Sequence, residues 1–251
     1  MENFKTIYNE KQKILGTHNA WEYYFKKINN LSLQKVYNSK KFILSADKNI
    51  ITPNNKFSKN LKKIFDKNFK ILDQTRKRIN FYKKRLGLEH NNNILGIHFR
   101  GTDMRISPNH PTPPYKHQIV EKIESYKKKH SISKIFLVTE DLENYKYIKE
   151  KFGDMVISIN NFRSNQTKVF NLNKRKNHRY KMGEEALVNS YLLSYCKIVI
   201  SSQTGISDFA KFINKDLKLI KIDNGLNSSS IFISYFQWKF KNFQYSFKKF
   251  I

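Results

Sequence analysis

Short apolar runs alternate with amphipathic stretches along the second part of the chain. The apolar runs at 94–97, 135–139, 155–159, 198–200 and 217–222 have the length of buried strands. Between them, residues 142–152, 184–196 and 206–213 place apolar side chains at helical intervals. Strands that alternate with helices are typical of a parallel sheet with helices on both faces. The pattern therefore predicts an α/β fold built on a doubly wound parallel sheet.

The first 92 residues show no clear rhythm of strands and helices. Residues 57–86 have a helical pattern, and Pro53 marks a boundary before it. An aromatic cluster nearer the start fits core packing better than ligand binding. Its members are Trp21, Tyr23, Tyr24 and Phe25. We predict a smaller N-terminal domain over 1–92, either reduced or lacking its start, and a Rossmann-like domain over 93–230.

The last segment, 231–251, combines aromatic and basic residues. Its apolar side chains step by fours and threes, which predicts one stripe along a helix. They are Phe236, Phe240, Phe243, Phe247 and Ile251. Lysines are interleaved with them, namely Lys239, Lys241, Lys248 and Lys249. The favoured interpretation is a helix that bridges back to the N-terminal domain; the alternative is a basic aromatic helix at a membrane surface.

Basic residues outnumber acidic ones and give a formal net charge of +28. Such a charge favours anionic partners, which include nucleic acids, anionic membranes and phosphorylated substrates. The charge is spread along the whole chain, however, so it indicates no particular partner.

Cys196 is the single cysteine, so an intrachain disulfide is excluded and a reducing compartment is expected. Its position before an apolar strand favours a buried structural thiol. The sequence has no apolar run of membrane-spanning length. We therefore expect a cytoplasmic protein, at most peripheral at the inner face of a membrane.

Polar residues follow the strand predicted at 94–97. They are His98, Arg100, Gly101, Thr102 and Asp103. In an open α/β sheet, ligands bind outside the carboxyl ends of strands. Arg100 offers a planar fork of donors that suits a phosphate, and Gly101 lets a ligand approach the backbone. The alternative is a solvated turn with a structural aspartate cap.

A second polar run follows the strand predicted at 198–200, directly before a predicted helix. It consists of Ser201, Ser202, Gln203, Thr204 and Gly205. A helix N-terminus presents unpaired N–H groups and the positive end of a dipole, which favour a phosphate. Together with Arg100, the hydroxyls of Ser202 and Thr204 are candidates to hold a diphosphate, with an ordinary helix cap as the alternative.

A third strand end carries Glu140 and Asp141. Asp141 fits an N-cap of the helix that follows, and contact with a nucleoside ribose or base is the alternative. The histidines are scattered, and the sequence contains no Asp-x-Asp motif. Because arginine and a helix terminus can neutralise a diphosphate, we expect no metal and no other cofactor.

These strand ends resemble the motifs of one enzyme family. His98-Phe-Arg-Gly-Thr-Asp103 is similar to the His-x-Arg-Arg-Thr-Asp motif of the superfamily of α1,6-fucosyltransferases and nodulation fucosyltransferases. Thr139-Glu-Asp141 resembles its second motif, and residues 183–194 with 198–203 resemble its third, in the same order. The resemblance covers roughly 93–215. It implies a GT-B fold, an acceptor-side N-terminal domain, and metal-independent, inverting transfer from a GDP-sugar, typically GDP-fucose.

The resemblance assigns roles residue by residue. Arg100 would hold the β-phosphate, Ser202 and Gln203 would add phosphate contacts, and His98 would lie near guanine. Asn189 stands where the family usually has an aspartate that accepts from guanine, and Gly101 replaces the second arginine of the first motif. The family's carboxylate base has no counterpart in 107–114. His110 is a candidate for that role, beside the alternative of a solvated histidine in a proline-rich loop.

We therefore take Arg100, Asp103 and His110 as the candidate catalytic residues. The candidate nucleotide-sugar-binding residues are His98, Arg100, Glu140, Asp141, Asn189, Ser201, Ser202, Gln203 and Thr204. The expected partners are a GDP-sugar donor and a glycan or lipid-linked saccharide acceptor. A non-enzymatic protein that binds RNA or another polyanion is the competing hypothesis, although no recognisable RNA-binding motif supports it.

Overall fold

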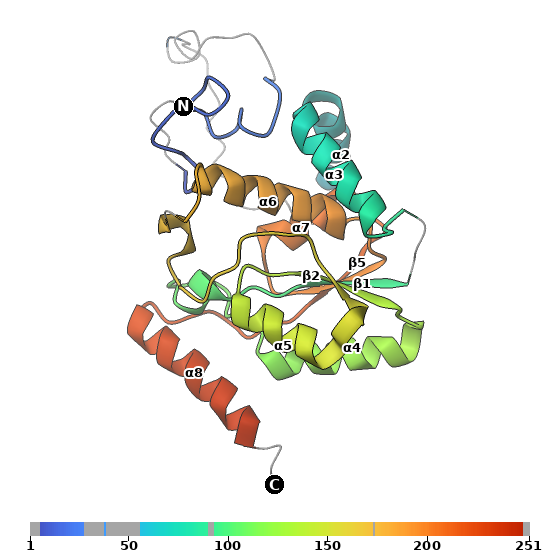
Figure 1. The fold of residues 1–251 in the computed structure, drawn as a ribbon, viewed down its shortest axis with the longest axis vertical. Helices are drawn as coiled ribbons and strands as arrows, with labels where there is room; N and C mark the ends of the chain where they lie inside the picture. Colours follow the sequence, from blue (N-terminus) through green and yellow to red (C-terminus); the bar gives the residue numbers. More distant parts are fainter. Residues whose placement is uncertain (1–5, 28–37, 39–55, 90–92, 173, 248–251) are drawn as a thin grey trace.

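The computed structural model describes residues 6–27, 38, 56–89, 93–172 and 174–247 (Figure 1). Five parallel strands form one sheet in the order β3-β2-β1-β4-β5. Their bounds are β1 Ile94–His98, β2 Lys134–Val138, β3 Val156–Ile157, β4 Ile198–Ser201 and β5 Lys218–Lys221. The predicted α/β fold with a parallel sheet is therefore confirmed.

β1 is the central strand of the sheet. All five of its residues are buried, as expected for a strand that is covered on both faces. His98 is paired in register with Val138 of β2 and with Ser201 of β4. The residues that follow these three strands therefore meet at one edge of the sheet.

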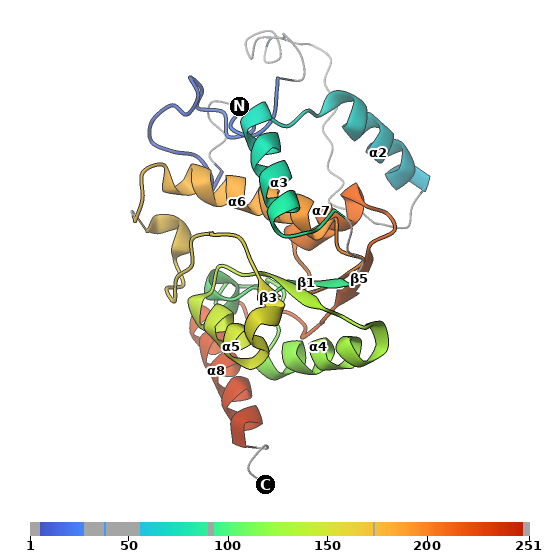
Figure 2. The ribbon, with the colours of Figure 1, turned by 45° about the vertical axis from the view of Figure 1, so that its right-hand side comes forward.

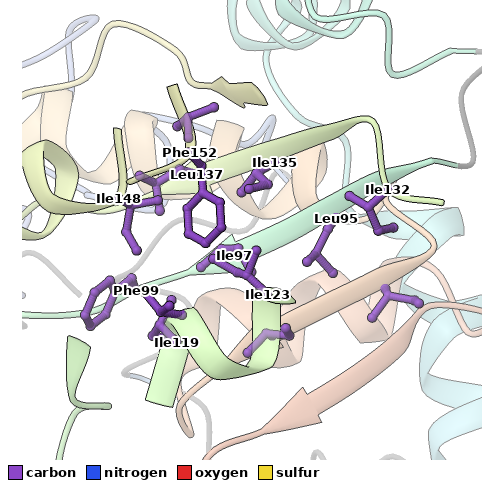
Figure 3. Packing of buried hydrophobic residues seen from close by; sticks show 14 of the residues in the cluster. Leu95, Ile97, Phe99, Ile119, Ile123, Ile132, Ile135, Leu137, Ile148 and Phe152 are labelled. Carbon is purple, nitrogen blue, oxygen red and sulfur yellow. The ribbon is translucent and has the colours of Figure 1, made fainter. Parts of the chain in front are cut away.

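Helices cover both faces of the sheet. α4 (Lys116–His130) and α5 (Leu142–Phe152) pack on one face, where Ile119, Ile123 and Ile148 meet alternate residues of β1 and β2 (Figure 3). α3 (Asp73–Arg85), α6 (His178–Leu193) and α7 (Gly205–Ile213) pack on the other face (Figures 1 and 2). Helices on both faces are the doubly wound arrangement that the alternation of elements predicted.

Cys196 belongs to the second of these two cores. Its side chain is buried, and burial raises the pKa of the thiol to about 12. A Cβ placed on Gly96 of β1 would lie 3.1 Å from Cys196 Sγ and 2.8 Å from Val199 Cγ2. Cys196 is therefore a buried, protonated core thiol, as predicted.

The described part of 1–92 packs directly on the sheet domain. Residues 57–86, predicted as one helical region, form two helices, α2 (Lys56–Asn68) and α3. They are separated because Ile71 pairs with Phe25, and because Leu72 N donates to Tyr24 O at 2.8 Å. No strand of the sheet comes from the described residues before 93. A division into two domains at residue 92 stays a prediction.

The aromatic cluster of the N-terminal segment lies against α6, and it packs as a core, as predicted. Tyr23 and Tyr24 are buried, and Tyr24 stacks on Tyr180 at a centroid distance of 5.7 Å. Tyr24 Oη donates to Tyr180 O at 2.9 Å. A Cβ on Gly183 would lie 2.7 Å from Tyr24 Cζ and 2.9 Å from Tyr8 Cδ1, so a glycine is needed for this close approach.

The C-terminal helix α8 (Ile231–Phe247) confirms the helical prediction for its part of the tail. Its placement differs from the expected bridge. α8 contacts the short 3-10 helix η1 (Thr102–Arg105), and Figures 1 and 2 show it on the side of the sheet opposite α6 and the N-terminal segment. Trp238 anchors it, because the Arg105 guanidinium lies over the Trp238 ring at 4.0 Å. Residues 248–251 lie outside the described residues.

Two further 3-10 helices, η2 (Gly153–Met155) and η3 (Val169–Asn171), lie in the loops before β4. Among the described residues, no helix has both the length and the apolar character that crossing a membrane requires.

Candidate functional site

A cleft of about 890 Å³ opens at the carboxyl edge of the sheet. Its volume lies within the range of roughly 300–1,000 Å³ that is typical of small-molecule sites. Four parts of the chain line it. The strand ends and α7 contribute Arg100, Gln203, Thr204, Gly205, Ile206 and Phe209; the loop after η1 contributes His110 and Pro111; α6 contributes Gly183, Ala186, Leu187 and Ser190; and the N-terminal segment contributes Tyr8, Trp21 and Tyr24.

Arg100 lies at the floor of this cleft, two residues after β1. Arg100 Nη2 donates to Asp103 Oδ1 at 2.8 Å, and Arg100 Nε lies 3.5 Å from Glu140 Oε1. Burial disfavours the charged guanidinium, but the charges of Glu140 and Asp103 outweigh burial and raise the pKa of Arg100. Nη2 is hydrogen-bonded, whereas Nε is buried without a hydrogen-bond partner among the described residues, so Glu140 acts on the guanidinium through its charge. Nη1 is left as a donor for a ligand. Asp103 therefore holds the Arg100 guanidinium and does not itself line the cleft.

Glu140 holds the turn that carries Arg100. Its Oε1 accepts from Gly101 N at 2.9 Å and from Thr102 Oγ1 at 3.0 Å. Burial opposes ionisation of Glu140, but the Arg100 charge and the Gly101 N–H lower the pKa of this carboxyl below its usual value. Thr102 is fully buried with φ of 37°, a conformation rarely adopted by a β-branched residue. The turn is thus fixed by a network that includes an ionised carboxylate.

Asp141 has a structural role in this network. Its Oδ1 accepts from Asn144 N at 2.9 Å and so caps α5, which confirms the cap prediction. Its Oδ2 accepts from Thr102 N at 3.3 Å and from the guanidinium of Arg105. Asp141 is fully buried and lines neither of the two cavities at this edge. Contact between Asp141 and a ribose is therefore not supported by its position.

The side chain of Asp141 leaves no space for a side chain at position 101, so glycine is required there. A Cβ at this position would lie 2.8 Å from the Asp141 Cβ and Cγ atoms, closer than any ordinary contact. An arginine, which the resembling motif has at this position, has no room here. The buried Asp141 side chain therefore explains why this chain has glycine at position 101, where the motif has its second arginine.

His98 joins the ends of β1 and β4. Its Nδ1 lies 2.9 Å from Thr204 Oγ1 and 3.3 Å from Ser201 Oγ. Burial and the nearby Arg100 charge lower the pKa of His98 to about 3, so the imidazole is neutral at physiological pH. A neutral His98 connects the Arg100 turn to the start of α7 without adding charge.

The N-terminus of α7 faces the cleft. Thr204 caps the helix, because its Oγ1 accepts from Ser207 N at 3.3 Å. Gly205 and Ile206, the first two helical residues, line the cleft, and amides at these positions have no partner within a helix. An ideal Cβ on Gly205 would have no atom within 4 Å. The start of α7 therefore offers backbone donors and open space to an anion.

Ser201 and Ser202 lie behind this surface. Both side chains are fully buried, and neither residue lines a cavity. Ser202 Oγ has no hydrogen-bond partner among the described residues. Of the four polar residues at 201–204, Gln203 and Thr204 line the cleft.

A second, smaller cavity of about 50 Å³ lies next to the cleft and shares Tyr8, Arg100, Ala186 and Ile206 with it. Its other lining residues include His98, Asp103, Glu140, Asn161, Phe162, Phe170 and Asn189. Asn189 is buried, and its Oδ1 has no hydrogen-bond partner among the described residues. This volume holds water rather than a nucleobase. A base at Asn189 would require Tyr8 and its neighbours to move.

The structure thus brings most of the predicted residues to one edge. Arg100, His110, Gln203 and Thr204 line the cleft, and His98, Asp103, Glu140 and Asn189 line the smaller cavity. Tyr8, Trp21 and Tyr24 are lining residues that the sequence did not indicate. The sequence assigned Trp21 and Tyr24 to a core and made no prediction for Tyr8, and nothing in it placed that core beside the strand ends. No cluster of three or more potential metal-ligating His, Cys, Asp or Glu side chains occurs in the part of the chain that the structure describes.

Comparison with known proteins gives the following matches. No protein-family model and no curated protein matches the chain. The solved structure of the α1,6-fucosyltransferase NodZ with GDP is 22% identical, at a TM-score of 0.44 over 65% of this chain and 48% of that one. The fucosyltransferase NodZ from Bradyrhizobium is 21% identical, at a TM-score of 0.44 over 67% and 51%. A variant of Arabidopsis thaliana FUT1 with GDP is 14% identical, at 0.42 over 70% and 41%.

All three are fucosyltransferase structures. The chain spans about half the length of the NodZ structures that it matches.

Proposed function

We propose that this chain belongs to a glycosyltransferase of the fucosyltransferase kind, which transfers a sugar from a GDP-sugar to a glycan or lipid-linked saccharide. The observation that carries the proposal is the convergence of Arg100 and the N-terminus of α7 on one large cleft. Two independent sources of positive potential at a cleft of this size favour a diphosphate ligand.

The diphosphate fits between these two groups. Arg100 Nη1 donates to the β-phosphate, and the amides of Gly205 and Ile206, with Gln203 beside them, bind the remaining phosphate oxygens. Arg100 also stabilises the negative charge that develops on the leaving diphosphate, which is where electrostatic stabilisation is most effective. Because arginine and a helix N-terminus supply the positive charge, this mechanism needs no metal.

His110 is the proposed base. It is exposed and lines the same cleft as Arg100. An acceptor hydroxyl oxygen attacks the anomeric carbon and forms the new glycosidic bond while its proton passes to His110. The bond between the anomeric carbon and the β-phosphate oxygen breaks, and its electron pair leaves with GDP. Attack on the face opposite the leaving group inverts the configuration.

The nucleoside part of the proposal rests on the smaller cavity. Asn189 Oδ1 is a buried acceptor without a partner among the described residues, a costly state that a donor on a ligand would relieve. Guanine offers such donors. The preference for guanine and for fucose follows from the resemblance of the motifs and remains part of the proposal, as does a cytoplasmic location.

The test is calorimetric titration with GDP, GDP-fucose, UDP and a short RNA, each in EDTA. We expect GDP and GDP-fucose to bind in EDTA with unchanged affinity after Mg²⁺ is added. UDP should bind more weakly, because uracil offers a single N–H donor, whereas guanine offers the adjacent N1–H and N2–H donors to Asn189 Oδ1.

Binding that vanished in EDTA and returned with Mg²⁺ would contradict the metal-free diphosphate site. Tight binding of RNA without binding of GDP would favour the polyanion-binding hypothesis. His110→Gln separates binding from chemistry, because it should keep GDP affinity and lose transfer to the acceptor.

A further inference from the structure

α8 exposes a row of large apolar side chains that the proposed enzyme chemistry does not use. We call Phe232, Ile233, Phe236, Phe240 and Phe243 the α8 stripe. Their exposed fractions are 71%, 48%, 52%, 60% and 61%. A contiguous apolar surface of this kind on a protein indicates a site of interaction.

The stripe faces away from the rest of the protein. α8 is attached through Ser234, which is 2% exposed, and Trp238, which packs against Arg105. Each helical residue advances by roughly 100°, so Phe236 lies about 200° from Ser234, on the opposite side of the helix. Figures 1 and 2 show α8 at the margin of the molecule, with its C-terminal end directed away from the sheet. The buried face therefore anchors α8, and the α8 stripe is presented outward.

The charge on and around α8 decides which partner fits. Lys239 and Lys241 are exposed on the same helix, and Lys239 Nζ lies 4.7 Å from the Tyr235 ring centroid. The whole chain carries a net charge of +28. Two copies of so basic a protein repel each other, whereas an anionic surface attracts both the helix and the protein as a whole. Aromatic and apolar residues on one face with lysines beside them are typical of a helix that lies in a membrane interface.

We propose that α8 is a docking helix for an anionic lipid surface. The phenylalanines of the α8 stripe enter the boundary between headgroups and acyl chains, and Lys239, which flanks the stripe on the helix, contacts headgroup phosphates. The helix lies parallel to the surface, and Ser234 and Trp238 keep it attached to the sheet domain.

The test is sedimentation of the full chain with vesicles of phosphatidylcholine alone and with vesicles that also contain phosphatidylglycerol. The wild-type protein should sediment with the anionic vesicles and much less with the neutral ones. Phe236→Ser and Phe240→Ser should each lower the partition coefficient roughly tenfold, from the loss of an inserted aromatic side chain. Lys239→Gln should lower it about fivefold on anionic vesicles.

Matched controls are Phe81→Ser on α3 and Lys151→Gln on α5, which remove an exposed aromatic and an exposed lysine elsewhere. Both should leave the partition coefficient unchanged. The proposal would be overturned if the folded wild-type protein did not sediment with anionic vesicles. It would also be overturned if the stripe variants and the Phe81→Ser control lowered the partition coefficient equally. Light scattering that showed a dimer for the wild type and a monomer for Phe236→Ser would instead identify the stripe as an interface between two copies.

Discussion

Replacement of Arg100 by alanine should weaken GDP binding by at least tenfold at neutral pH. A charge-assisted hydrogen bond contributes roughly 1.5–3 kcal/mol, which corresponds to about tenfold to about a hundredfold in affinity. The loss should lie at the upper end of this range, because the substitution also leaves Asp103 and Glu140 without their cation. Two unpaired carboxylates at the floor of the cleft repel a diphosphate.

The same substitution should change the pH dependence of binding. In the wild type burial is the largest influence on Glu140, but the Arg100 charge, together with the backbone hydrogen bonds to the carboxylate, keeps the pKa of Glu140 below its usual value. Without Arg100, burial is the main remaining influence, so the pKa of Glu140 should rise. Acidification then neutralises Glu140 and relieves its repulsion of the ligand. GDP affinity of Arg100→Ala should therefore increase as the pH falls below neutral, and that of the wild type should not.

Calorimetric titration of GDP across this pH range, on protein shown by circular dichroism to be folded, measures both effects. Arg100→Lys is the conservative variant, and its GDP affinity should lie between those of the wild type and Arg100→Ala, because lysine keeps the charge and loses the fork of donors. Arg163→Ala is the control, since Arg163 bonds to Ile159 O and lines neither cavity. A folded Arg100→Ala protein with wild-type affinity would refute the placement of a phosphate at Arg100.

Three further variants test the network behind the cleft. His98 has a pKa of about 3 when folded and an ordinary value of 6.5, so the unfolded chain binds more protons between these values. The free energy of unfolding of the wild type should thus fall by up to about 1.4 kcal/mol per pH unit below 6.5. In His98→Gln, urea unfolding should show a smaller fall with pH. An equal pH dependence in the two proteins would be inconsistent with a buried neutral imidazole. Asp141→Asn keeps an N-cap but leaves Arg105 buried without its partner, so it should cost about 3–5 kcal/mol in urea unfolding and leave GDP affinity unchanged. The reverse result would support a contact between Asp141 and the ribose. The control Asp73→Asn removes a carboxylate from a solvent-exposed pair and should leave urea unfolding nearly unchanged. Gly183→Ala should displace Tyr24 from α6 and so speed proteolysis within residues 6–27. Gly205→Ala is the control, because a Cβ at 205 has no atom within 4 Å, and it should leave the proteolysis rate unchanged. Equal rates in the two variants would mean that other contacts hold residues 6–27 in place.

The sheet could be predicted from the sequence because its strands are buried on both faces and read as continuous apolar runs. β1 was placed within one residue, and the missing residue is His98, a polar side chain that is buried because it pairs with Thr204 and Ser201. α4 was not predicted. Seven of its fifteen residues are charged, and its buried residues are Ile119, Val120 and Ile123 alone.

The candidate site could be predicted in part for a topological reason. Residues after β1 and β4 had to meet because these strands are neighbours, so Arg100 and Thr204 could be grouped before any contact was known. The cleft wall could not be predicted in this way. Tyr8 and Tyr24 reach the strand ends through contacts with Gly183, more than a hundred residues away in sequence, and no local pattern encodes such contacts.

The close approach of Gly101 and Asp141 has a consequence for how this chain and its relatives can vary. The space that a side chain at 101 would need is filled by the carboxylate at 141, so side chains of this size cannot occupy both positions at once. A homologue with arginine at the position of 101 should have displaced or shortened the residue at the position of 141, and the two positions should therefore covary. In this chain, the single substitution Gly101→Arg should be damaging, and part of the damage should be relieved when Asp141 is also shortened. A motif search that scores each position independently penalises the glycine and misses this compensation.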